Sequence, residues 1–66
     1  MNANQVLILA RKHLGNGTME SSARLCLADA VRLFDDGDHD AAKSRALKSL
    51  QYSVGCFHED FAKASS

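Results

Sequence analysis

The amino-acid sequence predicts a small all-α fold: a three-helix bundle built from one αα-hairpin and an extra N-terminal helix. Apolar residues recur every three or four positions through most of the 66 residues, which is the periodicity of one helix face. The chain has no proline, and its four glycines fall between or near the ends of the periodic segments. No segment alternates apolar and polar residues with the period of two that a strand requires. A chain of this length has room for one domain, so we expect residues 1–66 to form a single helical domain.

The first helix is expected at about residues 3–14. Asn2 or Asn4 can cap its start, and Gln5 stands three residues after Asn2, as in a capping box. Gly15 and Gly17 end the periodic pattern. The residues that share the predicted apolar face are Val6, Leu7, Leu9, Ala10, His13 and Leu14.

The second helix is expected at about residues 19–36. Thr18 is a good N-cap, and Glu20 in the first turn complements the positive end of the helix dipole. Gly37 stands where a helix commonly stops in a left-handed conformation. Its predicted apolar face comprises Met19, Ala23, Cys26, Leu27, Ala30, Leu33 and Phe34.

The third helix is expected at about residues 39–54, with Asp38 as its cap. Because the connection to the second helix is so short, the two helices should be antiparallel neighbours. Gly55 allows two interpretations. It can end the helix and leave a short turn at residues 58–63, or it can lie within a longer helix at a cost of roughly 1 kcal/mol. The same apolar spacing runs through Ala42, Ala46, Leu47, Leu50, Val54, Phe57 and Phe61.

Residues 30–50 carry small side chains and a Gly-Asp turn at characteristic spacings. These residues are Ala30, Gly37-Asp38, Ala42, Ser49 and Leu50. The segment resembles the centre of a tetratricopeptide-repeat (TPR-like) hairpin, in which small residues let two helices approach closely. Asp29 and Val54 depart from that pattern, and a single copy cannot stack as a solenoid does. A convergent helical hairpin explains the same residues. The resemblance implies protein or peptide binding rather than catalysis, and it indicates no particular partner.

Charge and cysteine content narrow the function class. Eight basic and eight acidic residues give a formal net charge of zero, so no strong field steers the chain to nucleic acid or an anionic membrane. Cys26 and Cys56 are too few for a secreted disulfide framework. They can be free thiols near the core or form one disulfide. The sequence shows neither a signal-peptide pattern nor a membrane-spanning run, and we expect a cytoplasmic protein.

The acidic turn resembles the start of a calcium-binding loop but does not complete one. Asp36, Asp38 and Asp40 alternate as oxygen ligands would, but Ala41 and Leu47 occupy the positions that require glycine and glutamate. Helix capping already accounts for Asp38 and Asp40. The sequence therefore predicts no calcium site.

The remaining chemistry-bearing side chains suggest neither a metal site nor an enzyme. Cys56, His58 and Glu59 are close in sequence, but residues two apart on a helix point in different directions. A bundle of this size also offers little room for a substrate. We therefore expect no metal, no cofactor and no catalytic residue. The side chains that could bind a transition metal through nitrogen or sulfur are His13, Cys26, His39, Cys56 and His58. No two of them have CxxC or HxxxH spacing.

The favoured function is protein binding, by a partner protein or by self-association as a homodimer. The candidate interface residues are Leu50, Val54, Phe57 and Phe61. Aromatic residues gather near the C-terminus, where they can cover the chain's own bundle or anchor an interface.

The alternative function is nucleic-acid binding through a basic face of the third helix. Its candidate residues are Lys43, Arg45 and Lys48. The acidic turn that leads into this helix would repel phosphate. The sequence therefore does not favour this alternative.

Overall fold

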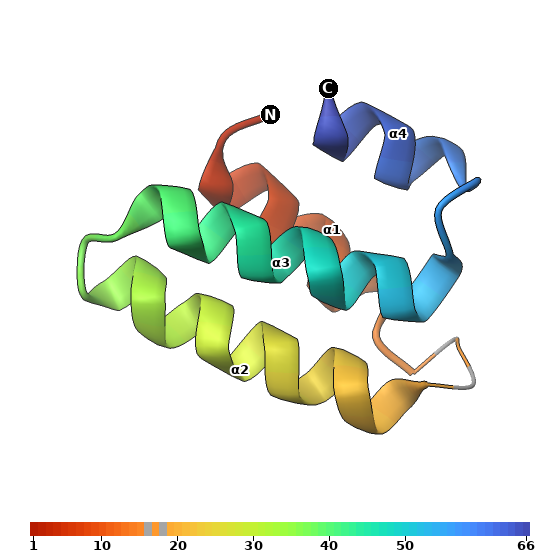
Figure 1. Cartoon of the computed structure of the whole chain (residues 1–66), viewed down its shortest axis with the longest axis horizontal. Coiled ribbons are helices and arrows are strands. Elements are labelled where there is room, and N and C mark those ends of the chain that lie inside the picture. The colour runs from red at the N-terminus through yellow and green to blue at the C-terminus, as the bar shows by residue number, and fades with distance from the viewer. Residues whose placement is uncertain (16, 18) are drawn as a thin grey trace.

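The computed structural model describes residues 1–15, 17 and 19–66, which form four helices and no strand (Figure 1). The all-α fold predicted from the sequence is confirmed. The chain ends α3 at Gly55, whose φ of 86° is a left-handed conformation that favours glycine. A short fourth helix follows, so the first of the two interpretations of Gly55 applies. The helices are α1 (Ala3–His13), α2 (Glu20–Asp35), α3 (His39–Val54) and α4 (Glu59–Ser65).

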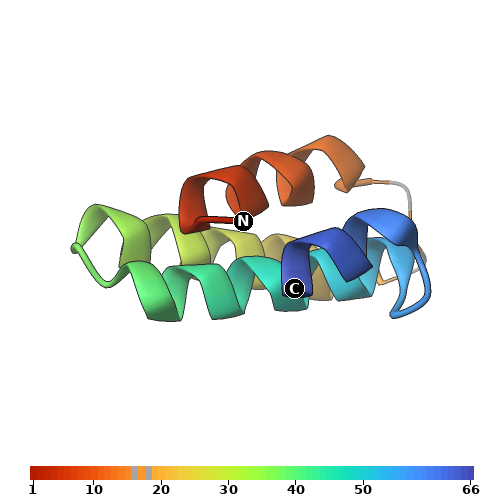
Figure 2. The same ribbon diagram turned by 90° about the horizontal axis from the view of Figure 1, so that it is seen from above.

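Helices α2 and α3 form an antiparallel hairpin and lie side by side in both views (Figures 1 and 2). The turn between them is a Schellman motif: Gly37 N–H donates to the Phe34 carbonyl and Asp38 N–H to the Leu33 carbonyl. Gly37 has a φ of 87° in this turn. The Asp38 side chain then accepts a hydrogen bond from Ala41 N–H and caps α3, as its position in the sequence predicted.

Small buried residues let the two hairpin helices pack closely. The contact between α2 and α3 is the most extensive in the fold. Ser49 Oγ donates a buried hydrogen bond of 2.7 Å to the Ala23 carbonyl, which joins the two helices directly. Leu50 is the largest side chain that is fully buried. The buried alanines on these helices are Ala23, Ala30, Ala42 and Ala46.

Helix α1 forms a second layer over the hairpin and packs mainly on α3 (Figure 2). It begins with the predicted capping box: Asn2 Oδ1 accepts from Gln5 N–H, and Gln5 Oε1 accepts from Asn2 N–H, both at 2.9 Å. The capping box selects Asn2 over Asn4 as the N-cap. The residues that α1 buries are Ala3, Val6, Leu7 and Ala10.

The start of α2 differs from the prediction. The periodic pattern predicts Met19 on the buried face of the helix, but Met19 lies at the N-cap position, outside the helical turns, and half of its surface is exposed. The predicted cap, Thr18, lies outside the described residues. The connection before α2 passes close to the end of α3, because a Cβ on Gly17 would lie 2.6 Å from the Ser53 carbonyl oxygen.

Helix α4 folds back so that the two termini lie on the same side of the molecule (Figure 1). Ala64 is buried in the core, and Phe61 packs against the same core from the outside. In the part of the chain that is described, no helix is both long enough and apolar enough to cross a bilayer.

Candidate functional site

The four predicted interface residues occupy different environments. Leu50 is fully buried in the core, so it offers no surface to a partner. Val54 and Phe61 are half-buried and pack against the core. Phe57 has a relative exposure of 103%, which means that its ring makes almost no contact within the chain. Phe61 therefore covers the bundle, which is one of the two expectations for the C-terminal aromatics, whereas Phe57 extends into water.

Phe57 lies in the connection between α3 and α4, at the same end of the bundle as the start of α2 (Figure 1). Gly55 redirects the chain after α3, and Cys56 and Phe57 follow in exposed positions. The exposed Met19 stands directly before α2. We call Met19, Cys56 and Phe57 the apolar end. It is formed by two connections that lie far apart in the sequence.

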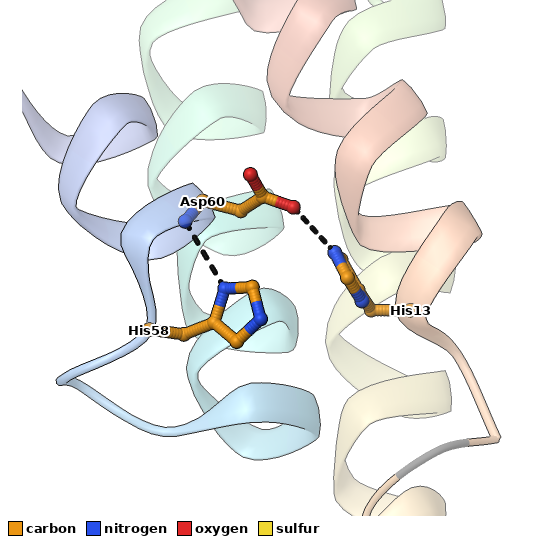
Figure 3. A group of neighbouring side chains, drawn as sticks. All are labelled: His13, His58 and Asp60. Atoms are coloured by element: carbon orange, nitrogen blue, oxygen red, sulfur yellow. Dashed lines mark hydrogen bonds and ion pairs between the residues drawn. The ribbon is translucent and has the colours of Figure 1, made fainter.

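Three polar side chains meet where the end of α1 approaches the start of α4 (Figure 3). His13 Nε2 lies 2.7 Å from Asp60 Oδ2, and the two side chains are only 14% and 18% exposed. The rings of His13 and His58 are edge to face, with centroids 5.2 Å apart. His58 Nδ1 accepts a hydrogen bond of 3.1 Å from Asp60 N–H and so caps α4. We call His13, His58 and Asp60 the His–Asp cluster.

The electrostatics of the His–Asp cluster favour an ionised carboxylate. The hydrogen bond from His13 lowers the pKa of Asp60 below its ordinary value, and the charges of His13, His58 and Lys12 act in the same direction. Partial burial opposes them by raising the pKa, but it is the weaker influence overall. Asp60 is therefore a carboxylate acceptor at neutral pH, with one oxygen held by His13.

His13 lies far from His58 and Asp60 in the sequence, and the residues of the His–Asp cluster were not predicted to meet. The apolar spacing predicts His13 on the apolar face of the first helix, and His13 stands 47 residues before Asp60. Short-range spacing of histidine and cysteine indicates only donors that are close in sequence, and His13 is joined to the other two residues only by folding. One local signal was present: His58 directly precedes Glu59 and Asp60, and acidic residues are typical of the first turn of a helix.

Of the three basic residues proposed for nucleic-acid binding, two are exposed and one is half-buried. Arg45 and Lys48 are exposed on α3, and Lys43 is half-buried. Asp38 and Asp40 lie at the start of the same helix, exposed and close in sequence. The surface around this end of α3 therefore carries both signs of charge.

The other candidate residues form no further cluster in the described part of the chain. Cys26 is half-buried and Cys56 is exposed, and both are free thiols. A small pocket of about 180 Å³ lies beside the stacked rings of Phe34 and His39, whose centroids are 4.6 Å apart. This volume is below the range of ordinary small-molecule sites. Its lining residues are Asn2, Ala3, Asn4, Phe34 and His39.

Comparison of the chain with protein-family models, with curated proteins and with solved structures gave no match. The likeness of residues 30–50 to a tetratricopeptide-repeat hairpin therefore rests on the spacing of its small residues alone.

Proposed function

We propose that the protein is a small helical interaction module and that its apolar end binds a second copy of the same chain. The observation that carries the proposal is the complete exposure of Phe57. Burial of a phenylalanine side chain is worth roughly 1.5–3 kcal/mol, and aromatic residues are frequent anchors of protein interfaces. In a two-fold dimer, the same surface of each copy meets its counterpart, so each Phe57 would contribute once to one interface.

The composition of the core supports the proposal that the apolar end binds a second copy of the chain. Among the described residues, seven of the eleven buried apolar residues are alanine, and only Val6 and Leu50 are large apolar side chains that are fully buried. Small domains with limited cores often gain stability by self-association. A standard interface buries about 800 Å² of each partner, which would be a substantial part of this chain's 4075 Å² surface.

Charge also permits self-association. The formal net charge is zero, so two copies approach without the long-range repulsion that a strongly charged chain would have. Both cysteines are free thiols. We therefore place the protein in a reducing compartment such as the cytoplasm. Its self-association would then not depend on a disulfide. The proposal assigns the chain no catalytic step, cofactor or membrane contact.

Phe57→Ser tests the proposal by sedimentation equilibrium over a concentration series in reducing buffer. The wild-type chain should approach twice the chain mass as concentration rises, and Phe57→Ser should remain monomeric with unchanged helical circular dichroism. Leu25→Ser is the matched control, because Leu25 is 71% exposed but lies in the second turn of α2 and is not one of the three residues of the apolar end. A wild-type chain that stays monomeric throughout would overturn the proposal, as would a dimer that Leu25→Ser dissociates and Phe57→Ser does not.

A further inference from the structure

We propose that His13, His58 and Asp60 bind one divalent transition-metal ion of the zinc class, and that the ion fastens α4 to α1. Two imidazoles and one carboxylate are a donor set that zinc commonly takes. The three side chains come from the C-terminal end of α1, the N-cap of α4 and its first turn. They point toward one another and are partly shielded from solvent (Figure 3).

The distances suit a single ion after small side-chain movements. One potential ligand atom from each residue lies within 4.8 Å of the other two. Zinc–nitrogen and zinc–oxygen bonds of about 2.0–2.2 Å place two donors of one ion roughly 3–4 Å apart. To bind one ion, His13 Nε2 and Asp60 Oδ2, which are 2.7 Å apart, must move slightly apart. The donor atoms that are farther apart must move closer together. Rotation of the side chains supplies movements of that size.

The protons of the His–Asp cluster can be assigned before and after binding. Because the Asp60 carboxylate can only accept, His13 donates to it from Nε2, and in a neutral ring an ion on Nε2 moves that proton to Nδ1. His58 Nδ1 accepts from Asp60 N–H, which leaves the His58 proton on Nε2. An ion on His58 Nε2 moves this proton to Nδ1, so the hydrogen bond from Asp60 N–H is lost and the ion holds the start of α4 in its place. When both rings are neutral, each proton moves from one ring nitrogen to the other and no net proton is released.

Three protein donors leave a fourth position of a tetrahedral ion for water. The partial exposure of His13 and Asp60 gives water access to that position. The ion would join segments 47 residues apart in the sequence. It would therefore act chiefly on the stability of the contact between α1 and α4, independently of self-association at the apolar end.

Isothermal titration of the full chain with zinc chloride, in a phosphate-free buffer at neutral pH, tests the site. We expect one ion per chain and a melting temperature that rises with zinc and returns with EDTA. His13→Ala and His58→Ala should each weaken binding at least about ten-fold. His39→Ala is the matched control, because His39 stacks on Phe34, lies outside the His–Asp cluster and should leave the affinity unchanged. Circular dichroism establishes that each variant is folded.

Two further measurements on the wild-type chain keep the proposal testable if a variant does not fold. Cobalt(II) absorbance should lack the intense thiolate charge-transfer band, because Cys26 and Cys56 are outside the donor set. In proton NMR, zinc should shift the ring signals of His13 and His58 and leave those of His39 in place. No saturable binding, a thiolate band, one ion per two chains, or equal effects of His39→Ala and His13→Ala would each overturn the site.

Discussion

The α2–α3 hairpin and the α1–α4 contact are held by different physical means. The hairpin has buried alanines, the fully buried Leu50, a Schellman turn and the Ser49–Ala23 hydrogen bond. Helix α4 has seven residues and is held by Ala64, Phe61 and the His–Asp cluster. An isolated helix that short is unstable in water, so α4 depends on those few contacts. The hairpin therefore carries the stability of the fold, and we expect α4 to open locally without unfolding it.

The largest expected effect comes from the hairpin core. Leu50→Ala should lower the free energy of unfolding by about 2–5 kcal/mol, because it leaves a cavity at a fully buried position in the core. Leu25→Ala is the control, since Leu25 is exposed on α2 and should change stability by less than about 0.5 kcal/mol. Urea denaturation followed by circular dichroism measures both. Equal losses would contradict the assignment of Leu50 to the stabilising core.

A smaller effect should separate two buried serines of α3. Ser49→Ala removes the hydrogen bond to the Ala23 carbonyl and should lower the free energy of unfolding by about 0.5–1.5 kcal/mol. Ser53 Oγ is buried and has no hydrogen-bond partner among the described residues. Ser53→Ala should therefore be neutral or stabilising. The same denaturation experiment distinguishes them, and a greater loss for Ser53→Ala would show that the polar contacts of α3 are misassigned.

The smallest effect should appear at the His–Asp cluster and depend on pH. The folded chain lowers the pKa of Asp60 from its ordinary value of 3.8, chiefly through the hydrogen bond from His13. The carboxylate therefore stabilises the fold above the unfolded pKa, and this contribution is lost as pH falls through the lower folded pKa. Asp60→Asn should be less stable than wild type at neutral pH, and the difference should shrink in acid below about pH 4. Denaturation of both proteins from neutral to acidic pH measures it. A difference that stays constant would argue against an ionic role for Asp60.

The features that the sequence predicted correctly depend on local chemistry. Asn2 with Gln5, Gly37 and Asp38 specify helix ends through bonds within a few residues, so their roles were readable from spacing. The prediction that Met19 is buried was wrong. Met19 continues the three-four spacing of the apolar residues, but it stands just before the first turn and lies outside the helix. Periodicity assigned Phe57 and Phe61 to one continuing face, but the positive φ of Gly55 breaks that face between them and Val54.

The candidate site depended on contacts that spacing does not encode. His13 and Asp60 meet only because α4 folds back beside α1, and nothing near either residue in the sequence indicates the other. Periodicity also could not tell how far each apolar side chain would be buried. Leu50 and Phe57 follow the same three-four pattern, yet one is fully buried and the other is fully exposed.

Native-state hydrogen exchange tests the contrast between the hairpin and α4 most directly. Amides in the middle of α2 and α3, such as those of Ala30, Ala46 and Leu50, should exchange only through global unfolding. The Ala62 amide, which bonds the His58 carbonyl in α4, should exchange through a local opening of lower free energy. His13→Ala should speed exchange at Ala62 further and leave the ratio of hairpin exchange to global unfolding unchanged. If the amides of α4 and of the hairpin were equally protected in wild type and in His13→Ala, α4 would not open separately from the hairpin.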